Sequence, residues 1–350
     1  MGELLPQEWL HPSVRTWAAG RARPARAPWA VALSGGADSL ALLLLLWAHW
    51  PDRRPRLRVL HFNHRLRGRA ADADERFCRR VCAALGLHLT VGRWRGRRRA
   101  VSEEQARAAR FAFFDRAMKG AGARALWLGH QQDDIAETML MRLARGSGTP
   151  GLAAPRPVQP VAGRLHLRPL LTLKKTAIAA ALRAAGVAWR EDRTNASAAF
   201  FRNRVRREVV PVWLKAAGRD AVAGAACARA LLEEDDVALE SWLDALHPFG
   251  SRGRSLNVAA LAGRPRALAR RALRRWLAVQ PLAGWISRQG FEDLLDVVAA
   301  GRPTRRSLGR SGFAIVRGGV LRFARNPGER KAGRKHAQAA KMRRAAAPFN

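Results

Sequence analysis

The chain has no tyrosine, few cysteines and too few acidic residues to balance its basic ones. Its 350 residues include three cysteines, and 27 Asp and Glu stand against 64 Lys and Arg. Cys78, Cys82 and Cys227 form no Cys-x-x-Cys pair and are too few for a disulfide framework. This cysteine usage is typical of a reducing cytoplasm.

Membrane and export signals are also missing. The apolar run from Leu40 to Trp50 is too short to span a bilayer, and the N-terminus carries Glu3 and Glu8 where a signal peptide would have an apolar core. We therefore expect a cytoplasmic protein that does not associate with membranes.

The excess of basic residues gives a formal net charge of +37. Such a charge favours a polyanionic partner, and nucleic acid is the default candidate. Alternatively, the basic composition reflects the codon usage of a GC-rich genome, because abundant Arg and Ala without Tyr are typical of such genomes.

Strands and helices alternate over the first two thirds of the chain. The apolar patterns predict strands at 29–33, 57–62, 87–91, 125–129 and 165–169. They predict helices at 40–50, 72–86, 102–118, 133–145 and 174–185. This alternation predicts an α/β fold with a doubly wound parallel sheet, whose ligands bind at the carboxyl ends of the strands.

After about residue 217 the strand rhythm fades. Helices are expected at 220–246, 264–278 and 288–299, followed by a hairpin of 314–316 with 320–323. We expect a lead-in at 1–28, an α/β domain at 29–217, a smaller, mainly helical domain at 218–326, and a basic, disordered tail at 327–350.

The loop after the first strand has the features of an anion site. It consists of Ser34, Gly35, Gly36, Ala37, Asp38 and Ser39. Glycines let a phosphate approach the backbone, and the N-terminus of the following helix supplies unpaired N–H groups. Asp38 would repel a phosphate unless Mg²⁺ lay between them. The alternative is an ordinary Gly-Gly turn of an α/β protein, and the loop does not match the Walker pattern.

A pair of acidic residues follows the fourth strand. Asp134 and Glu137 are three positions apart, so their carboxylates share one helix face just after His130. In a very basic chain this pair suggests a cationic ligand, either a metal or an amine. The alternative is an ordinary first helical turn, in which acids favour the helix dipole.

Two further clusters are rich in cations. Residues 61–68, from His61 onward, end the second strand, where a doubly wound sheet would face a nucleotide; the alternative is a solvated polar loop. Arg202 and Arg206 are four positions apart, so one helix face would present two guanidinium groups to RNA phosphates. The alternative is an ordinary basic helix face exposed to solvent. Arg110 precedes an aromatic run.

The order of these motifs resembles that of the tRNA(Ile)-lysidine synthases, within the PP-loop ATP pyrophosphatase superfamily. The resemblance spans about residues 30 to 215 and is carried by Ser-Gly-Gly-Ala-Asp-Ser, His-Phe-Asn-His-Arg-Leu-Arg-Gly, Asp-Glu-Arg-Phe, Glu-Glu-x-Ala-Arg, Asp-Asp-x-Ala-Glu-Thr, Arg-Gly-Ser-Gly, Arg-Pro-Leu-Leu, Arg-Glu-Asp-x-Thr-Asn and Arg-Asn-Arg.

The resemblance implies an activity and roles for individual residues. That family uses ATP to adenylate the wobble cytidine, position 34, of tRNA(Ile) with a CAU anticodon, then attaches L-lysine and releases AMP and pyrophosphate. Residues 34–39 would hold ATP, with Asp38 near Mg²⁺, and 29–217 would be the catalytic domain and 218–326 the tRNA-binding domain. The other implied roles are nucleotide binding for His61, catalysis for Asp38, Arg110 and His130, lysine binding for Asp134 and Glu137, and tRNA contact for Arg202, Arg204, Arg206 and Arg207.

The chain departs from that family in two places, and two other functions compete. Many members have a second histidine where this chain has Gln131 or Gln132, and the C-terminal part is short. A tRNA thiolase on the same scaffold usually needs a cysteine pair, which Cys78 and Cys82 on one expected core helix match poorly. A non-catalytic RNA-binding protein is the other alternative. The general base and the oligomeric state stay open, with a homodimer as one candidate.

Overall fold

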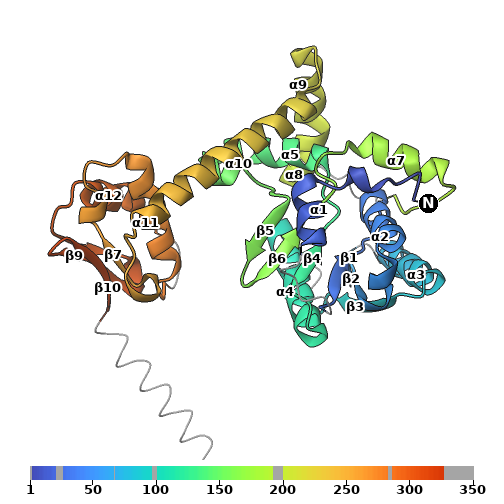
Figure 1. The fold of residues 1–350 in the computed structure, drawn as a ribbon, viewed down its shortest axis with the longest axis horizontal. Coiled ribbons are helices and arrows are strands. Elements are labelled where there is room, and N and C mark those ends of the chain that lie inside the picture. The colour runs from blue at the N-terminus through green and yellow to red at the C-terminus, as the bar shows by residue number, and fades with distance from the viewer. Residues whose placement is uncertain are drawn as a thin grey trace, which may run out of the picture. The chain divides into compact units, whose positions relative to one another are not determined.

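The computed structural model describes residues 2–20, 27–66, 68–96, 101–191, 200–282 and 286–326. The chain divides into two compact units, residues 1–233 and 234–350, and the division falls within helix α10 (Ala221–Ala245) (Figure 1). The expected tail at 327–350 lies outside the described residues.

A six-stranded sheet forms the centre of the first unit. Its order is β3-β2-β1-β4-β6-β5, and every neighbouring pair is parallel except β5 with β6. The strands are β1 (Trp29–Ala32), β2 (Leu57–Asn63), β3 (His88–Arg93), β4 (Ala125–Trp127), β5 (Val158–Val161) and β6 (Arg164–Leu167). The five expected strands are confirmed; β5, which contains Pro160 at the sheet edge, is an addition.

Helices of the first unit connect these strands and cover the sheet. They are α1 (Pro12–Ala19), α2 (Ala37–His49), α3 (Arg69–Ala84), α4 (Glu103–Ala121), α5 (Gln132–Leu143), α6 (Thr149–Leu152), α7 (Lys175–Ala184), α8 (Phe201–Arg204), a π-helical turn (Val205–Val209) and α9 (Val210–Ala217). Short 3-10 turns cover Gln7–Trp9 and Pro51–Arg56.

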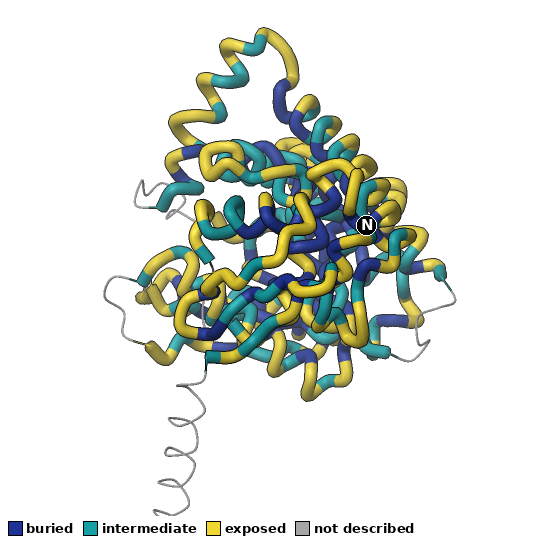
Figure 2. The backbone as a smooth tube through the Cα atoms, turned by 90° about the vertical axis from the view of Figure 1, so that its left-hand side faces the viewer, coloured by how far each residue is buried: buried dark blue, intermediate teal, exposed yellow. Residues whose placement is uncertain are grey.

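Alternate residues of the central strands enter two different cores. In β1, Trp29 and Val31 pack into the core that contains α2 and α7, whereas Ala30 packs into the core that contains Phe113 and Phe114 of α4. Side chains alternate across a pleated strand, so both faces of the sheet are covered and the expected doubly wound architecture is confirmed. In Figure 2 the buried stretches run through the interior, inside a more exposed outer layer.

Helix α2 has the most deeply buried sequence of this unit. Its residues from Leu40 to Leu46 are all buried, between the sheet and α7. Full burial of one leucine stabilises the fold by about 1.5–3 kcal/mol, so this helix is a rigid support for the loop at its N-terminus.

The second unit combines helices with an antiparallel sheet. Its elements are the C-terminal part of α10, α11 (Arg266–Ala278), α12 (Arg288–Ala299), β7 (Ser255–Asn257), β8 (Thr304–Ser307), β9 (Gly312–Arg317), β10 (Val320–Arg325) and 3-10 turns at Ser251–Gly253, Ala259–Leu261 and Gly309–Ser311. The sheet order is β7-β10-β9-β8. The expected hairpin is β9 with β10, while β7 and β8 were not expected.

Among the described residues, each helix is either too short or too polar to pass through a lipid bilayer.

Candidate active site

The glycine loop leaves β1 and enters α2 as the sequence predicts. Gly35 has a φ of +93°, a conformation that favours glycine, and Gly36 is the N-cap of α2. Ser39 Oγ donates to the Gly36 carbonyl at 3.0 Å and accepts from the Ser34 backbone N at 3.1 Å, while the two serine hydroxyls lie 3.0 Å apart. The serines thus hold the loop closed on itself, and no side chain among the described residues caps the helix N-terminus.

A distant part of the chain supports the same loop. The backbone N of Arg190 donates to the Gly35 carbonyl at 2.9 Å, and Arg190 Nε donates to Asp74 Oδ1 on α3 at 2.9 Å. This is the start of the Arg-Glu-Asp-x-Thr-Asn motif, and its remaining positions from 192 to 195 lie outside the described residues.

Asp38 stands in the first turn of α2 with a buried carboxylate. Its Oδ1 has no hydrogen-bond partner among the described residues. Burial, followed by the nearby carboxylate of Asp134, raises the pKa of Asp38 to about 7. A buried carboxylate oxygen that lacks a partner next to a second acid has the chemistry that suits a divalent cation such as Mg²⁺.

His61 of β2 lies behind the glycine loop. Its Nδ1 donates to the carbonyl of Leu33, just before the loop, at 2.9 Å, and the Cys78 sulfur lies 3.4 Å from the same nitrogen. Burial lowers the pKa of His61, so the ring is neutral near pH 7. The geometry therefore gives His61 a contact with the backbone that carries the loop.

The residues after His61 form a buried network rather than a free polar loop. Asn63 Nδ2 donates to Asp72 and to Glu75, both at 3.1 Å, and its Oδ1 accepts from the backbone N of Arg65 at 2.8 Å. Arg93 pairs with Glu75 at 2.6 Å. Arg67 of the same motif lies outside the described residues.

The loop after β4 lies directly against the glycine loop at the start of α2. A Cβ at Gly129 would lie 2.9 Å from the carbonyl carbon and oxygen of Asp38 and 3.0 Å from Cα of Ser39. Such contacts are too close for any side chain, so glycine is required here. Gly129 thereby brings the start of α5 beside the start of α2, at the carboxyl edge of the sheet.

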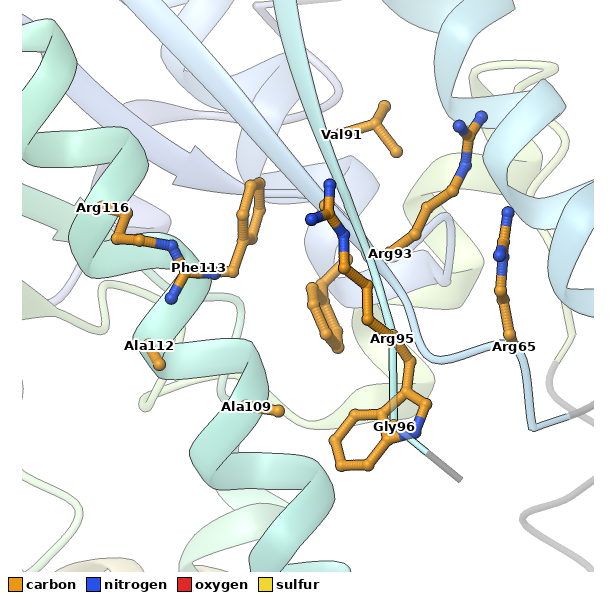
Figure 3. A pocket seen from close by; sticks show the side chains of 12 residues that line it. Arg65, Val91, Arg93, Arg95, Gly96, Ala109, Ala112, Phe113 and Arg116 are labelled. Carbon is orange, nitrogen blue, oxygen red and sulfur yellow. The ribbon is translucent and has the colours of Figure 1, made fainter. Parts of the chain in front are cut away.

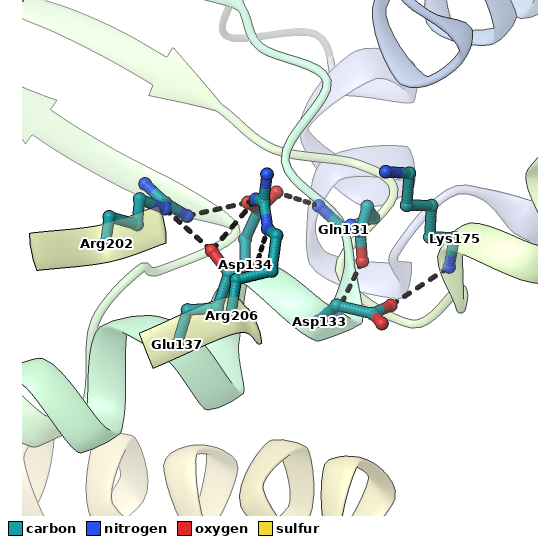
Figure 4. A network of polar contacts seen from close by, with 7 residues as sticks. All are labelled: Gln131, Asp133, Asp134, Glu137, Lys175, Arg202 and Arg206. Carbon is teal, nitrogen blue, oxygen red and sulfur yellow. Dashed lines mark hydrogen bonds and ion pairs between the residues drawn. The ribbon is translucent and has the colours of Figure 1, made fainter. Parts of the chain in front are cut away.

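The two predicted carboxylates of α5 lie together, but arginines already pair with them (Figure 4). Arg202 donates to Glu137 Oε2 at 2.7 Å and to Asp134 Oδ1 at 2.6 Å. Arg206 donates to both oxygens of Glu137. The Glu137 side chain is only 3% exposed. Two residues expected to contact tRNA and two expected to bind lysine thus form one ion-pair cluster.

Asp134 also stabilises the first turn of its own helix, which is the alternative role given above. Asp134 Oδ2 accepts from the backbone N of Gln131, and Gln131 accepts from the backbone N of Asp133, which makes a capping box. Arg204 and Arg207, the other two arginines expected to contact tRNA, are exposed.

A group of cations surrounds His130. Burial, followed by Arg168 and Arg202, lowers the pKa of His130 well below its usual value, so its ring is neutral. Burial and the neighbouring Arg107 lower the pKa of Arg110 to about 10, and they do the same for Arg168. The His130 Nδ1 and the Nε atoms of Arg110 and Arg168 have no hydrogen-bond partner among the described residues. Clustered guanidinium groups with unused donors suit an anion.

Arg168 was not among the expected site residues. It follows β6 directly and is only 4% exposed. The signal was present in the sequence, because the Arg-Pro-Leu-Leu motif begins at Arg168 where a parallel strand ends.

The sequence of the chain is similar to those of known proteins. A family model described as the PP-loop domain matches residues 15–213. A tRNA(Ile)-lysidine synthase of Geobacter sulfurreducens is 38% identical over 292 residues, which cover 79% of this chain and 60% of that protein. One from Symbiobacterium thermophilum is 38% identical over 73% of this chain and 55% of that protein. The chain thus spans about 60% of the length of these curated relatives.

A solved structure shares the fold. The U34-tRNA thiolase NcsA of Methanococcus maripaludis matches with a TM-score of 0.50 and 18% identity, over 62% of this chain and 76% of that chain. At that identity the likeness shows the fold alone.

Proposed function

The chain belongs to the PP-loop domain family, and we propose that within it this chain ligates L-lysine to C2 of the wobble cytidine, position 34, of tRNA(Ile) with a CAU anticodon. ATP is the co-substrate, and AMP and pyrophosphate are released. One observation carries the proposal: the Gly129–Asp38 contact joins the glycine loop to the acidic pair Asp134 and Glu137 at one edge of the sheet. The relatives named tRNA(Ile)-lysidine synthase support the same activity.

ATP phosphates are proposed to bind at the uncapped N-terminus of α2, where the backbone N–H groups of residues 37–39 lack helical partners. Asp38 would hold Mg²⁺ beside them, because its buried Oδ1 has no other partner. The metal would supply positive charge next to the triphosphate.

The chemistry proceeds in two displacements. The cytidine O2 attacks the α-phosphorus and pyrophosphate leaves. The lysine ε-ammonium then loses a proton to a base, and the neutral amine attacks C2 as AMP leaves. Negative charge develops at phosphorus in the first step, and Arg110 and Arg168 are the buried cations proposed to stabilise it. Asp134 and Glu137 would bind the lysine ammonium, in exchange for part of their present pairing with Arg202 and Arg206.

The cysteines argue against the thiolase alternative. Burial raises the pKa of Cys78 to about 12 and that of Cys82 to about 11, so both remain protonated thiols at neutral pH. Cys227 is exposed on α10. A sulfur-transfer or cluster-binding role needs accessible thiolates, and lysine ligation needs none.

The test is a direct reconstitution. Purified protein is incubated with ATP, radiolabelled lysine and a tRNA(Ile) transcript with a CAU anticodon, and label in RNA is measured against AMP formed. We expect equal amounts of both, with little label in a tRNA(Met) transcript of the same anticodon. AMP without label in the RNA, or label without AMP, would contradict the proposal.

Asp38→Ala should abolish turnover while leaving the affinity for tRNA within about twofold, because its carboxylate oxygen Oδ1 is buried in the glycine loop. Asp52→Ala is the matched control, since Asp52 is an exposed acid in the turn after α2. Near-normal lysidine formation by Asp38→Ala would show that the site assignment is wrong.

A further inference from the structure

A cavity of about 800 Å³ lies at the β3 edge of the first unit's sheet, outside the site described above (Figure 3). The carboxyl ends of β2 and β3 form one wall, and α4 forms the other. Three aromatic residues line it: Phe62, Trp94 and Phe113. Its volume is typical of ligand-binding clefts.

The cavity is separate from the glycine loop. None of residues 34–39 lines it. Consecutive residues of β2 point to opposite faces, so His61 contacts Leu33 behind the glycine loop, whereas Phe62 packs on Phe113 with ring centroids 5.6 Å apart. On α4 the lining residues Ala109, Ala112, Phe113 and Arg116 follow helical spacing.

A glycine shapes the wall that β3 contributes. A Cβ at Gly92 would lie 2.5 Å from the Phe113 ring. The missing side chain lets the Phe113 ring pack directly against β3 at the wall of the cavity.

The cavity carries positive charge and no acidic residue lines it. Its four arginines are Arg65, Arg93, Arg95 and Arg116. Figure 3 shows Arg116 on α4 at one side, Arg65 and Arg93 at the other, and Arg95 between them. Arg93 pairs with Glu75, whereas the other three form no ion pair among the described residues and are exposed.

Trp94 has a hydrogen-bond donor without a partner. Its indole Nε1 is buried and has no acceptor among the described residues. Its backbone N donates to the carbonyl of Asn63 at 2.9 Å, so the position of the residue is set by β2. Gly96 packs against the same indole, because a Cβ at Gly96 would lie 2.9 Å from Nε1. The Trp94 ring is therefore held in place at the wall of the cavity.

We propose that this cavity binds an unpaired ribonucleotide of the RNA substrate, at a position other than the reacting cytidine. The base lies against the aromatic residues, and Arg95 and Arg116 pair with backbone phosphates. Flat rings combined with unpaired arginines are the chemistry that recognises single-stranded RNA, since every base offers a face for stacking. This inference rests on the proposed function for the identity of the RNA.

The test measures the affinity for a fluorescent tRNA(Ile) transcript by anisotropy over a series of salt concentrations. Trp94→Ala should weaken binding about tenfold, and Trp94→Phe should restore most of it, because stacking and not folding is at stake. Arg116→Ala should lower the slope of log affinity against log salt by about one, since one phosphate contact is lost. ATP affinity should stay unchanged in each variant.

Arg124→Ala is the matched control, because Arg124 is another exposed arginine that makes no ion pair among the described residues and does not line the cavity. If Trp94→Ala and Arg116→Ala bind RNA as tightly as Arg124→Ala does, the inference is overturned, and an acidic peptide becomes the better occupant.

The same variants separate this inference from the proposed function. Wild-type protein that forms lysidine while the cavity variants keep full RNA affinity would refute the cavity assignment alone. If wild-type protein attaches no lysine but the cavity variants still lose RNA affinity relative to Arg124→Ala, only the proposed reaction is refuted.

Discussion

At the scale of the residue, Gly129 shows how an absent side chain can assemble a site. We expect Gly129→Ala to destabilise the fold by about 2 kcal/mol, because the new methyl group meets the Asp38 backbone at 2.9 Å and neither backbone can yield easily. Urea unfolding measures the loss, and ATP affinity should fall in parallel. Gly120→Ala, in open space on α4, is the control and should be neutral or stabilising by up to about 1 kcal/mol. Equal effects of the two substitutions would contradict the close contact.

Glu75 provides a pH-dependent test of the network behind β2. Burial alone would raise its pKa, but hydrogen bonds from Arg93, Asn63 and Arg79 lower the pKa of Glu75 to about 2. A carboxyl whose folded pKa is depressed contributes stability above its unfolded pKa of about 4.5, and that stability is lost as pH falls toward 2.

Glu75→Gln should therefore cost about 2 kcal/mol of unfolding free energy at pH 7, and the difference from wild type should shrink between about pH 4.5 and pH 2. Chemical denaturation at several pH values measures it. A difference that stays constant over this range would show that the ion pairs with Arg93 and Arg79 contribute nothing.

Some site residues were predictable from the sequence and others were not, for a physical reason. The glycine loop and the acidic pair are local patterns at strand ends, so Asp38, Asp134 and Glu137 could be predicted. The pairing of Arg202 with Glu137 joins residues 65 positions apart, and no local pattern carries that information. The Asn63 network was missed for the same reason. Arg168 was missed although a local pattern was present, because it begins the Arg-Pro-Leu-Leu motif at a strand end and was given no role.

At the scale of the element, ion pairs hold α5 against α8 and the π-helical turn that follows it. Two carboxylates of α5 face two guanidinium groups, so loss of one negative charge leaves the cluster with excess positive charge. Under the proposed function, Glu137→Gln should raise the KM for lysine at least about tenfold, while the KM for ATP changes less than about threefold.

Steady-state kinetics with each substrate varied in turn measure the two constants, and Glu104→Gln, an exposed acid in the first turn of α4, is the control. Equal increases in both KM values would count against an amine site at Glu137.

The three strands that the sequence did not predict, β5, β7 and β8, are all short. β8 has the sequence Thr-Arg-Arg-Ser, and β5 contains Pro160. Neither has the alternation of apolar and polar residues that marks a strand, and each exists because a neighbouring strand offers backbone partners. The strands β1 and β4 are equally short, but their residues are apolar and pack into a core, so their pattern was sufficient.

At the scale of the whole molecule, each unit has its own apolar core. Leu43 lies in the core of the first unit and Leu273 in that of the second, and both are fully buried. We expect two unfolding transitions in differential scanning calorimetry.

Leu43→Ala should lower the midpoint temperature of one transition, and Leu273→Ala should lower that of the other. Each substitution should reduce the unfolding free energy of its unit by about 2–5 kcal/mol. A single transition that both substitutions shift equally would show that the units unfold together.

The three thiols of the chain differ in a way that matters for any later experiment. Cys78 and Cys82 are buried in the first unit and stay protonated, whereas Cys227 is exposed to solvent on α10. Under mild conditions the native protein therefore behaves as though it had a single cysteine, and a maleimide dye or spin label can be attached to α10 without first engineering the sequence.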